Sequence, residues 1–435
     1  MDNRTFYIRT YGCQMNESDS ERISGTLIDN GYSMVATPDE ADLVVLNTCS
    51  IREGAENKVY SDLGRLRILE AERGTPMQVA VAGCVAQQEG EKILSRDRSV
   101  DLVFGSRAIG KLPEMLPRLE AGERFAELNV HTRPDEPGTH VRADGHRAFV
   151  TIMEGCDNHC AFCVVPATRG PEVSRRPEGI VAEVEQLAAE GYVEVTLLGQ
   201  NVTSYGKGLD TDFADLLTRI HAIPGIRRIR YTTSHPKDFS DRLIDTLADC
   251  PKVVRHLHLP LQSGSDAVLA RMGRGYTVAE YRRKIDRVRA KVPGIAITTD
   301  MIVGFPGETD ADHQATLRAV REIGYFNLYG FKYSRRPGTT ALTLDGHLDD
   351  EVRSARLIEL LALQKEITLE RHASLVGQTR EVLVEGESKR NASRLSGRLE
   401  ENVLVHFEGD PEWIGTVRPV RITEATVSAL IGEVH

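Results

Sequence analysis

The sequence predicts a multidomain α/β protein with three parts: a doubly wound parallel sheet, a partial (β/α)6 barrel and a small antiparallel β-barrel. Three observations predict it. Short apolar runs alternate with helical patterns over about the first hundred residues, six strand–helix repeats follow, and from Thr379 the pattern alternates residue by residue. Strand–helix alternation favours parallel sheets, whereas strands without helices favour a barrel. We place the domains at residues 1–125, 142–372 and 375–435.

The first part shows four strand-like runs with helical patterns between them. The strands are expected at Phe6–Arg9, Leu43–Leu46, Val79–Ala82 and Leu102–Phe104, and helices at Ser18–Asn30 and Glu53–Glu72. One cysteine follows each of the first three strands, namely Cys13, Cys49 and Cys84. Because the carboxyl ends of parallel strands meet at one edge of a sheet, these thiols are expected to converge there as a three-thiolate Fe–S site. The alternative is that they are small buried apolar side chains.

The second part begins after a polar, Pro/Gly-rich linker at His131–Arg147. Its six strands are expected near Phe149–Met153, Val193–Leu198, Ile229–Thr233, Val254–Leu259, Ile295–Ile302 and Asn327–Tyr333, with helices including Pro177–Glu190, Asp241–Asp249 and Val278–Val292. In α/β barrels the working face lies at the carboxyl ends of the strands. Polar and glycine motifs stand at those ends: GQN, TTSHP, LQSGS, GFPGE and YSRRPG.

A cysteine motif, CxxxCxxC, follows the first strand of this part at Cys156, Cys160 and Cys163. Three thiolates can hold three irons of a 4Fe–4S cubane, whereas a fully ligated cluster takes four. The missing ligand leaves one iron open to a small molecule. A zinc site that uses His159 as a fourth ligand is the alternative.

The third part follows a long helix expected at Asp350–Ser374. Lys389, Arg390, Arg394 and Arg398 form a basic stretch without an intervening acid, and Lys and Arg supply most phosphate affinity. We expect these four residues to contact RNA. The alternative is a solvated face, since seven Lys and Arg stand against ten Asp and Glu from Ala373 onward.

Composition restricts the remaining possibilities. The 435 residues carry a net charge of −10, which disfavours coating nucleic acid by bulk charge but allows a local basic surface. Seven cysteines are too few for a disulfide scaffold, and Cys250 reads as a structural thiol. The start shows no charged-then-apolar leader and no apolar run could cross a bilayer, so we expect a cytoplasmic protein without a membrane partner.

The cysteine motif, with Phe162 directly before its third cysteine, resembles the signature of the radical S-adenosylmethionine (SAM) enzymes. With both cysteine sets, the chain resembles the radical SAM methylthiotransferases over almost its whole length. The motifs are TYGCQMN (Thr10–Asn16), NTCSIREGAENKVY (Asn47–Tyr60), EGCDNHCAFCVVP (Glu154–Pro166), LLGQNV (Leu197–Val202), HLPLQSGS (His258–Ser265) and DMIVGFPGET (Asp300–Thr309). One departure is Ala167, where an aromatic residue is expected before Thr168.

The resemblance implies two 4Fe–4S clusters and SAM as cofactors, with Cys156, Cys160 and Cys163 holding the cluster that cleaves SAM. Cys13, Cys49 and Cys84 would hold an auxiliary cluster that carries the sulfur. TYGCQMN and NTCSIRE imply methylthiolation of carbon 2 of isopentenyl-adenosine beside the tRNA anticodon, with one SAM as methyl donor and one as radical source. The implied partners are tRNA, bound in part by a C-terminal TRAM domain, and an electron donor of flavodoxin or ferredoxin type. We expect a monomer.

Five residues are candidates for SAM contacts: Phe162, Gln200, Ser234, Gln262 and Val303. Phe162 is expected to pack at the cluster, the three polar residues end barrel strands, and backbone near Val303 is expected to approach adenine. Arg335 and Arg336 are candidates for phosphate or base contact. The alternative is core packing for Phe162, loop capping for each of the three polar residues, and a solvated loop for one of the two arginines.

Two further functions remain open from the sequence. The same chemistry could act on threonylcarbamoyl-adenosine in tRNA or on an aspartate of a ribosomal protein. A non-catalytic RNA-binding protein with structural clusters is the remote alternative, and two sites that each lack a fourth cysteine argue against it.

Overall fold

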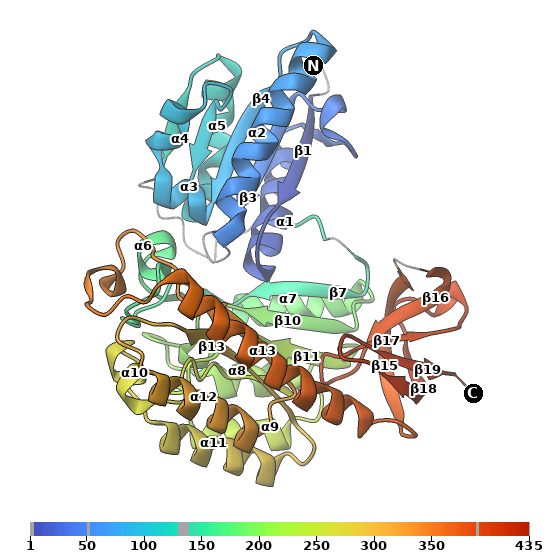
Figure 1. Cartoon of the computed structure of the whole chain (residues 1–435). Coiled ribbons are helices and arrows are strands. Elements are labelled where there is room, and N and C mark those ends of the chain that lie inside the picture. The colour runs from blue at the N-terminus through green and yellow to red at the C-terminus, as the bar shows by residue number, and fades with distance from the viewer. Residues whose placement is uncertain (1–3, 50–52, 129–138, 143, 389–390, 435) are drawn as a thin grey trace.

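The computed structural model describes residues 4–49, 53–128, 139–142, 144–388 and 391–434. Figure 1 shows the three predicted parts: an N-terminal sheet domain in blue, a strand–helix barrel in green to orange, and a small red barrel at its side. Within the described ranges, no helix combines the length and apolar character needed to cross a bilayer.

The N-terminal domain is a doubly wound sheet of six parallel strands in the order β2-β1-β3-β4-β5-β6. The strands are β1 (Thr5–Thr10), β2 (Ser33–Met34), β3 (Leu43–Thr48), β4 (Gln78–Gly83), β5 (Leu102–Phe104) and β6 (Phe125–Glu127). Helices α1 (Gln14–Asp29) and α5 (Leu112–Glu120) pack on one face, while α2 (Glu53–Arg73) and α4 (Glu91–Arg96) pack on the other. The predicted fold is confirmed, with two short edge strands, β2 and β6, added.

The middle domain carries six parallel strands in two sheets, β7-β10-β11 and β12-β13-β14. They are β7 (Arg147–Thr151), β10 (Glu194–Leu198), β11 (Arg228–Tyr231), β12 (His256–His258), β13 (Ala296–Val303) and β14 (Asn327–Lys332). An isolated bridge between Ile229 and Val253 joins the two sheets. The strands therefore form the predicted incomplete barrel.

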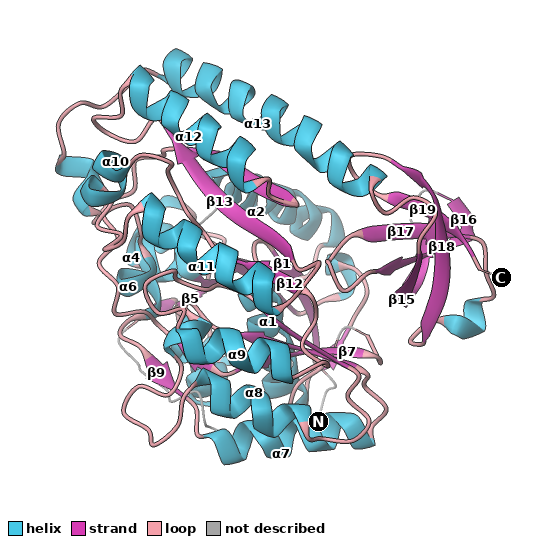
Figure 2. Cartoon of the chain, turned by 90° about the horizontal axis from the view of Figure 1, so that it is seen from below, coloured by secondary structure: helices cyan, strands magenta, loops and turns pink. Residues whose placement is uncertain are grey.

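A layer of helices covers the outside of this barrel (Figure 2). It consists of α7 (Pro177–Ala189), α8 (Phe213–His221), α9 (Asp241–Asp249), α11 (Val278–Lys291), α12 (Asp310–Ile323) and α13 (Asp350–Ala373). Alternation along β11 places Ile229 and Tyr231 in the core under these helices, whereas Arg228 and Arg230 project from the opposite, inner face.

The C-terminal domain is a closed five-stranded barrel in the order β15-β16-β17-β19-β18. Its strands are β15 (Thr379–Ser388), β16 (Asn391–Arg398), β17 (Leu404–Phe407), β18 (Val417–Ala425) and β19 (Leu430–Glu433). The expectation of a purely antiparallel barrel was wrong in one place, because β17 and β19 pair in parallel. The barrel closes through that pair, because β19, which follows β18 in a hairpin, lies next to β17.

Arginines fix this small barrel to the middle domain. Arg228 donates to the carbonyls of Arg398 and Glu381 at 2.9 and 2.8 Å, and Arg230 donates to those of Glu400 and Leu399 at 3.0 and 2.7 Å. Because Arg228 begins β11, the small barrel lies at the amino ends of these strands, away from the cysteine motif.

Candidate functional site

The CxxxCxxC loop runs between β8 (Met153–Glu154) and α6 (Val165–Arg169), at the carboxyl end of the first barrel strand. Backbone bonds secure it: the Cys156 amide donates to the Gly170 carbonyl at 3.1 Å and the Ala161 amide to the Met272 carbonyl at 2.8 Å. Cys156, Cys160 and Cys163 all line one cavity of about 530 Å³. The structure thus brings the three predicted thiols to the working face of the barrel.

Burial dominates the electrostatics of two of these thiols. It raises the pKa of Cys163 to about 12 and also raises the pKa of Cys156. At Cys160, the buried Arg274 guanidinium donates to Sγ at 3.2 Å, and His235 Nε2 lies 3.9 Å from that sulfur. Thiols with raised pKa values stay protonated in the absence of a cation, and metal ligation is the usual way to remove such a proton.

The cavity wall contains polar atoms that lack hydrogen-bond partners within the described structure. These are Ser234 Oγ, Gln262 Oε1 and Tyr333 Oη. Thr233 and Gln262 also hold left-handed backbone conformations, with φ of 68° and 75°. Buried orphan groups and strained backbone cost free energy and concentrate at ligand sites, so the wall fits a polar ligand such as the methionyl and ribose parts of SAM.

The other candidate SAM contacts are placed differently. Phe162 lines the cavity and packs edge-on against Phe305, with ring centroids 6.5 Å apart. Gln200 also lines it, but its Oε1 accepts from the Gly155 amide at 2.5 Å and so caps the cysteine loop. Val303 lies in the barrel core and is absent from the described lining, where its neighbour Ile302 appears instead.

Of the two candidate arginines in YSRRPG, Arg336 lines the cavity and Arg335 does not appear in the described lining. Cys250 is buried in the core of the barrel domain, as expected of a structural thiol. Ala167 is exposed on α6.

The second cysteine set stands at three strand ends of the N-terminal sheet. Cys13 is the N-cap of α1 after β1, Cys49 follows β3, and Cys84 opens α3 (Cys84–Glu89) after β4. A close-packed glycine stands directly before two of the cysteines: Gly12 before Cys13 and Gly83 before Cys84. A Cβ on Gly12 would lie 2.4 Å from Cys49 Cβ, and one on Gly83 would lie 2.3 Å from the Thr48 carbonyl. The three strand ends are therefore drawn together as predicted.

Hydrogen bonds lower the pKa of Cys13 to about 6. The largest contribution comes from Cys49, and the Arg169 charge adds to it, while burial opposes both. Asn16 accepts from Cys13 Sγ at 3.3 Å and donates to the Asn47 side chain at 3.2 Å and to the Thr48 carbonyl at 2.9 Å. Thiols that favour the thiolate are suited to bind iron.

Among the described residues, no group of three or more His, Cys, Asp or Glu side chains is placed to bind a single metal ion. A cubane has a different requirement, because each thiolate binds a separate iron. At both sites the available donors are three cysteines, and thiolates are the ligands that iron–sulfur clusters use. The residues present at both sites therefore fit such a cluster.

The C-terminal barrel carries part of the predicted basic stretch. Lys389 and Arg390 lie outside the described residues. Arg394 is half-buried on β16, and Arg398 at its end pairs with Glu385 at 3.2 Å. Arg398 is thus engaged within the barrel in this structure.

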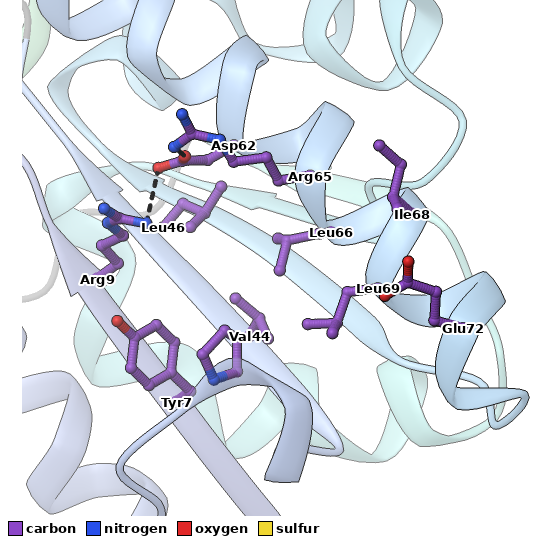
Figure 3. Close-up of a pocket in the computed structure, with 11 residues that line it drawn as sticks. Tyr7, Arg9, Val44, Leu46, Asp62, Arg65, Leu66, Ile68, Leu69 and Glu72 are labelled. Atoms are coloured by element: carbon purple, nitrogen blue, oxygen red, sulfur yellow. Dashed lines mark hydrogen bonds and ion pairs between the residues drawn. The ribbon is translucent and has the colours of Figure 1, made fainter.

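A separate pocket of about 320 Å³ lies in the N-terminal domain between strands β1 and β3 and helix α2 (Figure 3). Its wall is largely apolar, with an Arg9–Asp62 ion pair at 3.2 Å on one side. None of the predicted site residues lines it.

Sequence reasoning missed several residues at the two sites. Arg274 and His235 contact Cys160, Asp300 lines the cavity, and the charge of Arg169 acts on Cys13. The partners of Arg169 and Arg274 are far away in the chain, so no local spacing signals these contacts, whereas His235 and Asp300 stand in the TTSHP and DMIVGFPGET motifs. A local signal at Arg274 is its place between two glycines, which have φ of 69° and 70°.

Comparison with protein families divides the chain into three matches. Residues 5–105 match "Uncharacterized protein family UPF0004", residues 150–320 match the "Radical SAM superfamily", and residues 373–435 match the "TRAM domain". These matches coincide with the parallel-sheet domain, the incomplete barrel and the closed small barrel.

Curated relatives match the whole chain. A tRNA-2-methylthio-N(6)-dimethylallyladenosine synthase from Geobacter metallireducens is 47% identical over 99% of this chain and 98% of its own length. A protein of the same name from Anaeromyxobacter dehalogenans is 51% identical over 99% of this chain and 94% of its own.

Solved structures show the same fold at low identity. The radical SAM methyltransferase TsrM from Kitasatospora setae, with cobalamin and a [4Fe-4S] cluster bound, has a TM-score of 0.58 at 16% identity, covering 79% of this chain and 77% of that one. The cobalamin-dependent radical enzyme OxsB has a TM-score of 0.55 at 13% identity, covering 84% of this chain and 56% of that one.

Proposed function

The chain belongs to the family of tRNA-2-methylthio-N(6)-dimethylallyladenosine synthases, and on that premise we propose that it methylthiolates carbon 2 of isopentenyl-adenosine beside the anticodon of tRNA. One SAM would donate the methyl group and a second would supply the radical. The observation that carries this proposal is near full-length identity of 46–51% to eight such synthases. The two three-cysteine sites support it.

We propose that Cys156, Cys160 and Cys163 hold the cluster that binds and cleaves SAM. The cavity beside them supports this role, because Ser234 and Gln262 line it and each has a buried polar atom without a hydrogen-bond partner. These two side chains would bind the methionyl or ribose groups, and Phe162 would pack against the cluster. Gln200 would act through the loop that it caps, and Ile302, rather than Val303, would face the nucleoside.

We propose that Cys13, Cys49 and Cys84 hold the auxiliary cluster, and that the two clusters together supply radical generation and sulfur. The chain's own task is then placement: it positions base and cofactors and keeps water away, which is how proteins use such cofactors. Extrusion of the base from the anticodon loop would cost a few kcal/mol.

The remaining partners follow from this chemistry. Relatives named for a tRNA product and the TRAM match support tRNA as the substrate. We propose that Arg394, with Lys389, Arg390 and Arg398, contributes phosphate contacts. The reductant would be a one-electron carrier of flavodoxin or ferredoxin type, the enzyme would act as a cytoplasmic monomer, and residues 1–125, 142–372 and 375–435 would form its three domains.

The alternatives from the sequence are less well supported. Each relative described above is named for the dimethylallyl-adenosine product rather than for threonylcarbamoyl-adenosine or a ribosomal protein. A purely structural role for the clusters leaves the orphan polar atoms around the cysteine loop unexplained.

Nucleoside mass spectrometry of tRNA tests the proposal. A strain that lacks this protein should accumulate isopentenyl-adenosine without its methylthio form, and the wild-type gene should restore that form. Purified protein reconstituted without oxygen should hold about eight irons per chain, as two cubanes require. Normal methylthio-isopentenyl-adenosine in the deletion strain would refute the proposed substrate.

A further inference from the structure

The N-terminal and middle domains meet through buried polar side chains. Helix α1 follows Cys13 and buries Ser18, Asp19 and Glu21, which is unusual for polar residues in a helix. Ser18 bonds Thr151 of β7 at 3.1 Å. The helix therefore docks onto the middle domain through polar contacts rather than an apolar stripe.

Among the described residues, three ion pairs join α1 to the middle domain: Arg142 with Glu21 at 2.9 Å, and two that flank the cysteine sites. The first of these two joins Arg169 to Asp19. Arg169 lies six residues after Cys163, and its side chain is 2% exposed. Its Nη1 and Nη2 reach the two carboxylate oxygens of Asp19 at 3.3 and 2.5 Å, as a fork. Asp19 lies six residues after Cys13. One bidentate contact thus connects the two cysteine sets through short segments of chain.

In the second ion pair the cation comes from the N-terminal domain and the anion from the middle domain, the reverse of the first pair. Arg22, one turn along α1 from Asp19, donates to Glu154 at 3.0 Å, and the Glu154 side chain is 3% exposed. Glu154 precedes Cys156 by two residues. In these two pairs each domain gives one cation and one anion, and the four residues flank both cysteine sites. We call Asp19, Arg22, Glu154 and Arg169 the crossed ion pairs.

The Arg169 charge also acts directly at the N-terminal cysteines. It lowers the pKa of Cys13, and Cys84 in turn helps to raise the pKa of Arg169. A positive charge of the middle domain thus acts on Cys13.

Stability alone does not account for this arrangement. Buried ion pairs are often no more stabilising than well-packed apolar residues, and their best-attested use is to fix register and orientation. A forked arginine–carboxylate contact adds geometric specificity. Two pairs of opposite sense, to Arg169 of α6 and Glu154 of β8, resist both sliding and rotation of α1 on the middle domain.

We propose that the crossed ion pairs are positioning residues that set the distance and orientation between the two cysteine sites, so that SAM cleavage at one is coupled to sulfur transfer from the other. The inference rests on the proposed function. It assigns to Arg169 and Asp19 a role in coupling, distinct from holding either cluster.

The main test exchanges the buried fork for a neutral one, in the double variant Asp19→Asn with Arg169→Gln. Reconstituted protein is assayed with SAM, dithionite and isopentenyl-adenosine tRNA, and 5′-deoxyadenosine formed per methylthio product is measured. Since a misplacement of about 1 Å can cost about a hundredfold, this ratio should rise about tenfold or more. The magnetic interaction between the two reduced clusters, read by EPR relaxation, should change too.

The matched control is Arg147→Gln with Glu385→Gln, which removes the 2.6 Å ion pair between the middle domain and the C-terminal barrel. It breaks a domain contact away from the cysteines, so the ratio and the EPR relaxation should stay as in the wild type. If the main variant does not fold, Arg22→Gln with Glu154→Gln replaces it.

An unchanged ratio and unchanged relaxation in a folded crossed-pair variant that holds both clusters would overturn the inference. So would an equal rise in the control, which would indicate general loosening. A loss of iron from the N-terminal site alone would overturn it too, because Arg169 would then hold the cluster. Failure of the wild-type enzyme to form product would instead refute the proposed function.

Discussion

Arg274 donates a hydrogen bond to Cys160, a proposed cluster ligand, and its removal should change the redox potential of that cluster measurably. The side chain is 4% exposed. Besides Cys160 Sγ, it donates to the Pro260 carbonyl at 3.1 Å and to Tyr276 Oη at 2.9 Å. Tyr276 in turn donates to the Pro260 and Leu261 carbonyls, so the guanidinium is held rigidly against the sulfur.

The sign and size of the effect follow from this contact. Reduction adds an electron to the cluster, and a fixed cation stabilises the more negative state, so Arg274→Gln should lower the midpoint potential. A hydrogen bond to a charged group contributes about 1.5–3 kcal/mol. Since about 1.4 kcal/mol corresponds to about 59 mV for one electron, the shift should be at most about 60–130 mV. Arg274→Lys keeps the charge and should shift the potential less.

The assay is an EPR-monitored redox titration of protein in which Cys13, Cys49 and Cys84 are replaced by alanine, so that one cluster gives the signal. Arg271→Gln serves as the control. Arg271 precedes Arg274 by three residues, and it pairs with Asp345 at the surface. An unchanged or raised midpoint in Arg274→Gln would refute the reasoning.

Three further predictions concern the cysteines, the domain contact and pH. Cys160→Ala should keep about four of about eight irons and lose 5′-deoxyadenosine formation; retained SAM cleavage would show that the two cysteine sites are misassigned. Arg230→Ala leaves the buried Glu194 carboxylate without its 2.9 Å partner, which should cost about 3–5 kcal/mol and expose the C-terminal barrel to limited proteolysis. Burial lowers the pKa of His256 from 6.5 to about 3, so the unfolded chain binds the proton more readily and stability falls as pH drops below 6.5, by at most about 1.4 kcal/mol per pH unit. His256→Gln should flatten this fall in urea midpoints; an equally steep slope would contradict the assignment.

The sequence predicted most of the fold because its strands are apolar runs with helices between them. Leu102–Phe104 and Asp241–Asp249 were placed with their exact bounds. Strand β16, Asn391–Arg398, gives little local signal because it is polar and reads NASRLSGR, with only Leu395 buried in the core among its larger side chains. This segment is a strand because it pairs with β15 and β17, and the local sequence pattern does not show such pairing.

The cysteines could be predicted as sites, whereas the groups around them could not. Thiols at strand ends converge through topology, which periodicity reveals. Arg169 and Asp19 are separated by 150 positions in the chain and lie on two domains. Each alone resembles an ordinary surface charge, and only docking of α1 on the middle domain buries them together.

The polar inner face of the incomplete barrel gives a physical reason for the three-domain arrangement. A complete barrel fills its interior with its own side chains. Here Arg228 and Arg230 stand on the inner face of β11, and burial of their charges requires partners. Carbonyls of the C-terminal barrel satisfy them at the amino ends of the strands, while α1 covers charged groups beside the cysteine loop. Two domains that the barrel needs for its own stability thus border it, so the proposed RNA-binding domain and the proposed sulfur-carrying domain are held by one scaffold.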